Sequence, residues 1–226
     1  MDVSEAIATR RSVRAFLDTA VPEAVLHRVI ARAARAPSGG NLQPWRIYVL
    51  TGAPLTGLKA RMRKRLATDP SPDPCEYAIY PENLWEPYRT RRYRVGEMMY
   101  ALLGISREQR EARIARFRAN YDFFGAPVGL FCYIDRRMGP PQWSDLGMYL
   151  QNVMLLLREE GLDSCPQESW STYNRVVADV LSPPPELMLF CGMAIGFADA
   201  TAPVSRLSAE RMAPDEFATF LGFNTP

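Results

Sequence analysis

The longest helical pattern in the chain lies at residues 144–160 and is apolar along one face. Apolar side chains return every three or four residues, at Leu146, Leu150, Val153, Met154 and Leu157. Gly161 follows, and glycine commonly ends a helix. A helix of this length spans about 25 Å at 1.5 Å per residue. We therefore expect a long helix that lies across the middle of a domain or along a subunit interface.

Around this helix, further helical and strand patterns alternate unevenly, with no internal repeat and no linker between two cores. The sequence predicts a single domain over residues 1–226, of the α+β class. Helices are predicted at 4–10, 22–36, 55–66, 94–103, 106–118, 144–160 and 173–181, with a last helix starting at Pro214. Strands are predicted at 45–51, expected to be buried, at 128–134 and at 187–195, with a turn at 166–169.

Charge and composition exclude several classes of protein. The net charge is only +2, and the 27 basic and 25 acidic residues are interspersed. The protein as a whole therefore has no electrostatic field that would attract nucleic acid or a membrane surface. His27 is the only histidine, and the four cysteines are widely spaced, which excludes a zinc-ligand set and a histidine-based triad. We expect no metal and no nucleic-acid partner.

The N-terminal segment carries charges where a secretory signal would be apolar. No uninterrupted apolar run reaches the length of a membrane-spanning helix. These features predict a cytoplasmic protein with reduced thiols, and no membrane partner.

Four residues at the end of the first predicted helix could bind a phosphate. Each planar guanidinium group of Arg10, Arg11 and Arg14 can donate two hydrogen bonds to a phosphate, and Ser12 adds a hydroxyl donor. The same residues could instead form the basic C-terminus of a helix, which complements the helix dipole. The residues alone leave both interpretations open.

A second candidate is the loop at 37–45, PSGGNLQPW. Its two adjacent glycines let the backbone approach a flat ligand, and Asn41 and Gln43 offer donors and acceptors to a heterocycle. It could equally be an ordinary turn between a helix and a strand. The chain contains neither GxGxxG nor GxxxxGK[ST], which argues against a Rossmann or P-loop site.

The segment at 69–93 is rich in proline up to Pro87 and then in tyrosine and arginine. Five prolines prevent regular structure over most of residues 69–88, and loops of this length are usually functional or disordered. The segment could be a lid over a bound ligand or a surface loop packed by its own aromatic side chains.

Taken in order, four blocks resemble the FMN-dependent nitroreductase family: ATRRSVRAF, APSGGNLQPW, GLDSCPQESW and CGMAIGFADATAPVSR. PENLWEPYRTRRYRVG and NYDFFGAPVGLF are similar to a branch of nitroaromatic reductases. The resemblance implies a central mixed β-sheet flanked by helices. It also implies an intertwined homodimer whose C-terminal arm wraps over the partner, with FMN between the subunits.

The resemblance also implies roles for individual residues. Arg10, Ser12 and Arg206 would hold the FMN phosphate, with Arg11 as a further contributor and Arg14 at the ribityl or pyrimidine side. Val204 and Ser205 stand where many relatives carry basic residues or asparagine before the late arginine. The opposite subunit would supply Pro37, Ser38, Gly39 and Asn41. Pro166, Gln167, Glu168 and Ser169 would lie against the ring, with a backbone N–H of Glu168 or Ser169 directed at N5.

The implied activity is ping-pong transfer of hydride from NADH or NADPH, through FMN, to a nitroaromatic or quinone-like acceptor. Because the flavin performs the chemistry, no catalytic side chain is expected. Tyr88, Arg89 and Arg92 of the Pro-rich segment are predicted to contact the acceptor. Alternatives on the same scaffold are a reductive dehalogenase, an enone reductase, a flavin-fragmenting oxygenase and a flavin-binding protein without turnover.

Overall fold

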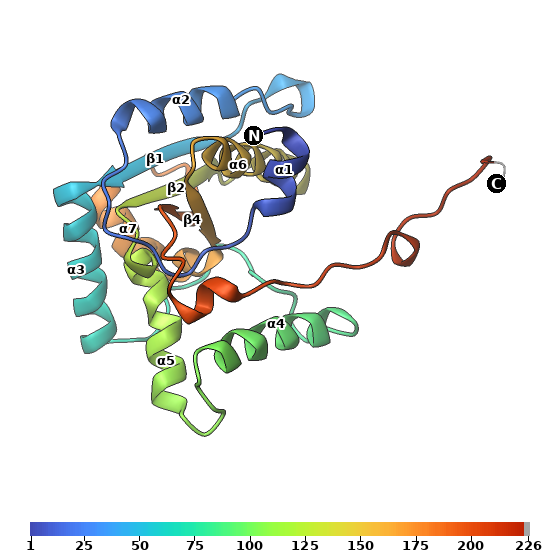
Figure 1. The fold of residues 1–226 in the computed structure, drawn as a ribbon. Helices are drawn as coiled ribbons and strands as arrows, with labels where there is room; N and C mark the ends of the chain where they lie inside the picture. The colour runs from blue at the N-terminus through green and yellow to red at the C-terminus, as the bar shows by residue number, and fades with distance from the viewer. Residues whose placement is uncertain (224–226) are drawn as a thin grey trace.

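A four-stranded sheet forms the middle of the protein in the computed structural model, which describes residues 1–223 (Figure 1). The strand order is β1-β2-β4-β3, and all three neighbouring pairs are antiparallel. The strands are β1 (Arg46–Thr51), β2 (Val128–Asp135), β3 (Asp163–Gln167) and β4 (Leu187–Gly196).

The α+β class is confirmed, but the expected mixed sheet is wrong for residues 1–223. The parallel pairing found there is an isolated bridge between Ser12 and Ser164, beside β3. The chain around Ser12 touches β3 too briefly to become a strand, so the sheet itself stays antiparallel.

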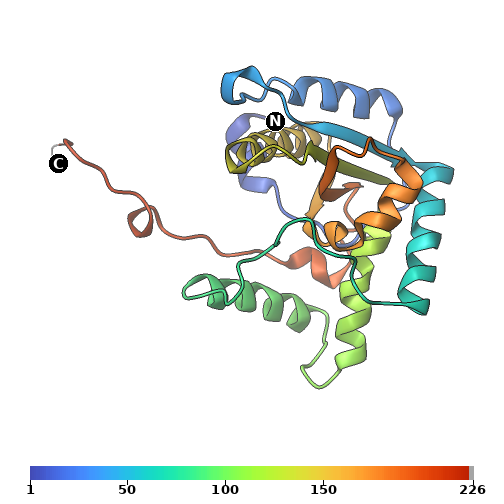
Figure 2. The same ribbon diagram turned by 180° about the vertical axis from the view of Figure 1, so that it is seen from behind.

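Both faces of the sheet are covered, so that most residues of the two inner strands are buried. Along β2 the side chains alternate, with Leu130 and Cys132 facing one core and Phe131 and Tyr133 facing the other. The first core is closed by α2 (Glu23–Ala33) and α6 (Pro140–Glu159). The second is closed by α3 (Gly52–Thr68), η2 (Ala119–Gly125) and α7 (Asn174–Leu181), as Figures 1 and 2 show.

Two strand predictions need correction. Residues 45–51 were expected to be a buried strand, yet β1 lies at the edge of the sheet and Leu50 is its one buried side chain. The predicted turn at 166–169 begins inside β3 instead, since Pro166 pairs with Met193. Proline lacks the N–H that a central strand needs, but an edge strand such as β3 tolerates it.

Several helix boundaries differ from the predictions. The helix predicted at 106–118 begins at Arg110, and the one predicted at 22–36 ends at Ala33. Two other differences lie beside prolines. The longest helix, α6, begins at Pro140 rather than 144, because its two prolines occupy the first turn, where no intrahelical N–H bond is required. The helix α4 (Tyr88–Leu102) begins directly after Pro87, six residues earlier than predicted. The remaining α-helices are α1 (Val3–Thr9) and α5 (Arg110–Arg118).

Short 3-10 turns complete the structure: η1 (Gly39–Asn41), η3 (Glu168–Tyr173), η4 (Pro203–Arg206) and η5 (Pro214–Glu216). The last of these replaces the helix predicted to start at Pro214. Residues 208–223, which we call the C-terminal arm, extend away from the body of the protein (Figures 1 and 2). Without a body to pack on, the arm's apolar side chains cannot support a longer helix.

None of the helices within residues 1–223 has the length and apolar content needed to cross a membrane. In the same part of the chain, no three His, Cys, Asp or Glu side chains gather closely enough to hold a metal ion.

Candidate functional site

The end of α1 brings the predicted phosphate-binding residues to the edge of the sheet. Asp2 caps the helix, since its Oδ1 accepts from the backbone N–H of Glu5 at 2.8 Å. The helix ends where Arg10 turns to an extended conformation. Beyond it, the backbone N–H of Val13 donates to the carbonyl oxygen of Ser164 at 3.0 Å. Residues 10–14 are therefore held alongside β3.

A cavity of about 860 Å³ opens at this edge. Its lining includes all four predicted residues of the cluster, Arg10, Arg11, Ser12 and Arg14, together with Gln151, Arg158 and Asp163 from α6 and β3, and with Arg211 from the C-terminal arm. The last four were not predicted from the sequence. Their types alone carry no signal, because α6 and the arm reach this cavity only through the tertiary fold.

Arg206 does not line this cavity. It is exposed at the end of η4, which packs against α4. Five residues later in the chain, Arg211 lines the cavity and lies near Arg10, since its charge lowers the pKa of Arg10. The sequence-based assignment of the phosphate to Arg206 stays a prediction.

Positive charge exceeds negative charge in this cavity. Burial lowers the pKa of Arg10, and the nearby charge of Arg211 lowers it further. Asp163 is the one acidic residue in the lining, and its Oδ1 is already paired with Arg158 Nη1 at 2.7 Å. The remaining guanidinium groups lie close together without a carboxylate between them, which favours a bound anion.

The segment at 166–169 spans the end of β3 and the start of η3, and it leaves two buried oxygens without partners within residues 1–223. Gln167 donates from Nε2 to the carbonyl oxygen of Asn120 at 2.7 Å, while its Oε1 has no partner in the described part of the chain. The Ser169 hydroxyl is also buried without a partner within residues 1–223. Burial raises the pKa of the Glu168 carboxyl. Unpaired buried polar atoms of this kind call for a ligand or ordered water.

The loop at 37–41 is well defined but lies outside the cavity. Gly40 and Asn41 have positive φ angles of 56° and 57°, which glycine and asparagine tolerate best. The backbone N–H of Gly39 approaches both carboxylate oxygens of Asp145 at 3.3 Å. No residue of this loop lines the cavity that contains Arg10. Within one chain, the two predicted cofactor elements are therefore not brought together.

Tyr88, Arg89 and Arg92 all lie in the first turns of α4. Tyr88 is half exposed and contacts the Trp85 ring edge-on at 5.4 Å between centroids. Arg89 is paired with Glu86 at 2.8 Å. Arg92 lies over the Tyr80 ring at 4.2 Å. Arg89 and Arg92 line an opening beside α4, and Arg92 also lines a smaller cavity next to the main one, whereas Tyr88 lines neither.

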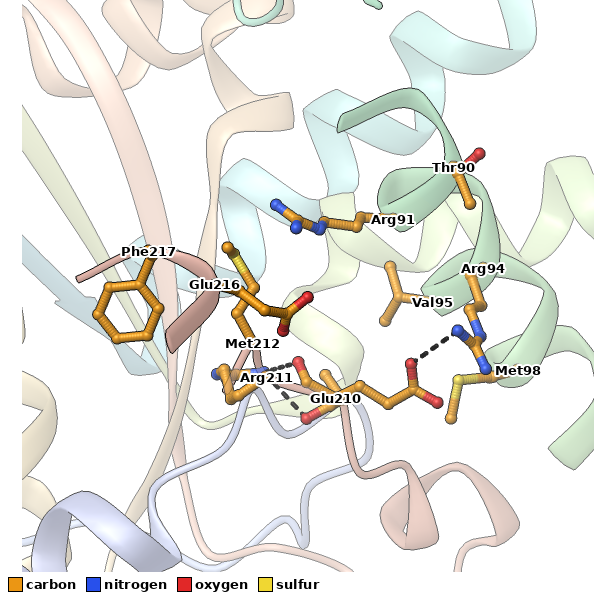
Figure 3. A pocket seen from close by; sticks show the side chains of 11 residues that line it. Thr90, Arg91, Arg94, Val95, Met98, Glu210, Arg211, Met212, Glu216 and Phe217 are labelled. Atoms are coloured by element: carbon orange, nitrogen blue, oxygen red, sulfur yellow. Dashed lines mark hydrogen bonds and ion pairs between the residues drawn. The ribbon is translucent and has the colours of Figure 1, made fainter. Parts of the chain in front are cut away.

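The other face of α4 meets the C-terminal arm. Figure 3 shows Arg94 of α4 pointing to Glu210 of the arm, with an ion pair of 3.1 Å between them. The space between helix and arm has a volume of about 710 Å³ and is also lined by Arg91, Met212 and Phe217. The arm is thereby attached to the body at its start.

Known proteins resemble this chain over nearly its whole length. The sequence model of the nitroreductase family matches residues 7–197. A 4-nitrobenzoate reductase of Pseudomonas putida is 39% identical over 223 residues, which cover 99% of this chain and 97% of that protein. A nitrobenzene nitroreductase of Ectopseudomonas oleovorans is 35% identical over 219 residues, covering 97% and 96%.

Among solved structures, the FMN and NADPH-dependent nitroreductase NfnB from Sphigopyxis sp. strain HMH has the same fold. It superposes with a TM-score of 0.94 at 49% sequence identity, covering 99% of this chain and 100% of the other.

Proposed function

The chain belongs to the nitroreductase family, and we propose that it is an FMN-dependent oxidoreductase that takes electrons from NAD(P)H and reduces nitroaromatic acceptors. The observation that carries this proposal is the cavity between α1, β3 and the C-terminal arm, where several arginines converge without matching carboxylates.

The residues of this cavity fit the phosphate of FMN. Arg10, Arg11 and Arg211 offer charged donors, and Ser12 adds a hydroxyl. A dianionic phosphate would offset the repulsion and burial that lower the pKa of Arg10. We therefore assign the phosphate to these four residues. Arg206 stays a weaker candidate, since it does not line the cavity, although the adjacent Leu207 does.

Arg14 lies further along the same wall and is assigned to the ribityl or pyrimidine side, where its charge favours a reduced, anionic ring. Pro166, Gln167, Glu168 and Ser169 are assigned to the ring face. The backbone N–H groups of Glu168 and Ser169 begin η3, and the first N–H groups of a helix have no partner within it. When bound, FMN supplies the chemistry, accepting hydride from the nicotinamide and passing electrons to the acceptor.

We further propose an intertwined homodimer. Four apolar side chains of the arm, Phe217, Phe220, Leu221 and Phe223, are 68–82% exposed. Such a group on an extended segment favours burial against a second copy of the chain. In that dimer, the partner's loop at 37–41 would complete the ring site, which accounts for its distance from the cavity of its own chain.

The homodimer is tested by the mass of the full chain in solution, measured by light scattering. The variant Phe220→Asp combined with Leu221→Asp should weaken association, because it would bury two charges. A monomeric wild-type protein would contradict the proposal.

We propose that the Pro-rich segment 69–93 forms the lid, and that its mobile part is the second half. The first half is tied to the body, since Asp73 N donates to Thr172 O at 2.9 Å and Asn174 Nδ2 donates to Pro74 O at 3.3 Å. Tyr77 is also anchored, through its hydroxyl, to the carbonyl oxygen of Phe190. Tyr88, Arg89 and Arg92, at the start of α4 in the second half, would then contact the acceptor.

Donor and acceptor would use the same site in turn, so the proposal includes ping-pong kinetics. Quinone-like acceptors and a cytoplasmic location are part of the same proposal. The other flavin enzymes of this scaffold, and a binding protein without turnover, are the alternatives that the experiment has to exclude.

The test is an anaerobic absorbance spectrum of the full-length protein reconstituted with FMN. It is recorded before and after NADPH, then NADH in a separate sample, and finally after nitrobenzene. Bleaching of the flavin by a pyridine nucleotide and its recovery with nitrobenzene support the proposal. Failure to bind FMN, or bound FMN that neither nucleotide bleaches, would refute it.

A further inference from the structure

A smaller cavity lies between α4, α5 and the body of the protein, and its lining is both cationic and aromatic. Its volume is about 240 Å³. Three arginines line it, Arg14, Arg92 and Arg116, and no acidic residue does. Most of the remaining surface comes from aromatic and apolar side chains, including Tyr80, Tyr100 and Phe124. This combination fits a flat ring that carries a negative charge.

Arg92 has a free guanidinium group. It lies 4.2 Å over the Tyr80 ring and has no ion-pair partner within residues 1–223. Three other arginines of α4 and α5 are instead paired with carboxylates: Arg89 with Glu86, Arg94 with Glu210, and Arg113 with Glu97. Arg92 is therefore available to bind an anion from outside the chain.

Arg116 approaches the same cavity from α5. Its Nη2 donates to the carbonyl oxygen of Arg14 at 3.1 Å, and its guanidinium lies 5.0 Å from the centre of the Phe124 ring. Its Nε is buried without a hydrogen-bond partner within residues 1–223. Burial lowers the pKa of Arg116, and so does the charge of Arg14. A carboxylate here would offset both effects.

The two cavities are adjacent, because Arg14, Val95 and Leu207 line both of them. A molecule in the smaller cavity would lie beside whatever the larger one binds. The size also limits the occupant. An apolar cavity of about 150 Å³ binds benzene, so about 240 Å³ has room for one substituted benzene ring. A whole dinucleotide exceeds it.

We propose that this cavity selects an aromatic carboxylic acid as the acceptor, with Arg92 and Arg116 binding its carboxylate and the rings of Tyr80 and Phe124 packing around its benzene ring. The inference rests on the proposed function, because it defines the substrate class of the same site. It distinguishes this chain from an enzyme that treats neutral and anionic nitroaromatics alike.

The experiment compares 4-nitrobenzoate with 4-nitrobenzamide, which has nearly the same shape but no charge. We expect wild type to have the higher kcat/KM for the benzoate. Arg92→Met should lower that value on the order of 10- to 100-fold, as expected for a lost hydrogen-bonded charge, and change the benzamide value by less than about threefold. Arg110→Met, at the exposed start of α5, is the matched control and should leave both values unchanged.

Binding is measured separately, by calorimetric titration of the protein with benzoate and with benzamide. Benzoate should bind more tightly to wild type than to Arg92→Met, whether or not either nitro compound is reduced. Arg116→Lys, which keeps a charge in the half-buried position, should bind benzoate better than Arg116→Met does.

Three results would overturn the inference. The first is an equal fall in kcat/KM for both acceptors in Arg92→Met, and the second is benzoate binding that no variant changes. The third is an effect of Arg92→Met confined to a higher KM for NADPH. The last would assign Arg92 to a nucleotide phosphate instead. Reduction of neither compound by wild type would refute the proposed function, while the benzoate titration would still decide the anion site.

Discussion

The backbone N–H of Gly39 lies 3.3 Å from both carboxylate oxygens of Asp145, a residue of α6 that is only 4% exposed. This contact links the glycine loop to the longest helix across 106 residues of sequence. Because the loop has positive φ angles at Gly40 and Asn41, such a contact helps to keep it in one conformation.

We predict that Asp145→Ala lowers the free energy of unfolding by about 1 kcal/mol, the usual contribution of one hydrogen bond. If the loop completes the partner's flavin site, the variant should also weaken FMN binding. Thermal unfolding and FMN titration measure the two effects. Asp179→Ala, at an exposed site of α7, is the control. An unchanged stability in Asp145→Ala would show that the contact contributes nothing.

Arg211→Ala is predicted to weaken FMN binding by about 10- to 100-fold, because it removes a charged donor from the cavity that also contains Arg10. Arg206→Ala should have a much smaller effect, since Arg206 is exposed at the end of η4. Fluorescence titration of FMN into each apoprotein measures both. The reverse order would restore the assignment made from the sequence.

Gly192 is predicted to be required for packing rather than for ligand binding. A Cβ atom at this position would lie 2.4 Å from Cδ1 of Trp170, a fully buried side chain. Gly192→Ala should therefore destabilise the fold by about 1–3 kcal/mol, the usual cost of overpacking a core.

Gly57→Ala provides the matching control for that variant. Gly57 lies within α3 with open space around it, so its replacement should stabilise the helix by up to about 1 kcal/mol. Chemical denaturation of both variants gives the comparison. If Gly192→Ala were as stable as wild type, the packing explanation would be wrong.

Thiol chemistry should separate Cys75 from the other three cysteines. Cys75 is exposed, whereas Cys132, Cys165 and Cys191 are buried. Burial raises the pKa of Cys191 from 9.0 to about 12. At pH 8 a thiol reagent should therefore modify one cysteine in the native protein and four after unfolding, and none in native Cys75→Ser.

The same pKa shift has a consequence for stability. The folded state keeps the proton of Cys191 up to about pH 12, while the unfolded state loses it near pH 9. The contribution of this thiol to the free energy of unfolding is therefore complete below pH 9 and is lost as pH rises toward 12. Cys191→Ala should show a shallower loss of stability over this range in denaturation curves. An identical slope would contradict the assignment.

Several features were predictable from the sequence because they depend on local chemistry. The spacing of Leu146, Leu150 and Val153 predicts α6, and the structure confirms all three as buried. Pro37 and the glycines after it predict the compact loop, although α2 already ends at Ala33, three residues before the predicted end at 36.

The sequence by itself also determined that residues 10–14 form a cationic cluster, since side-chain charge does not depend on the fold. Only the tertiary structure decided what that cluster faces. Pairing with β4 made Pro166 part of a strand, and the path of the C-terminal arm put Arg211 rather than Arg206 beside Arg10. Local patterns cannot encode such choices, because they depend on contacts between residues far apart in the chain.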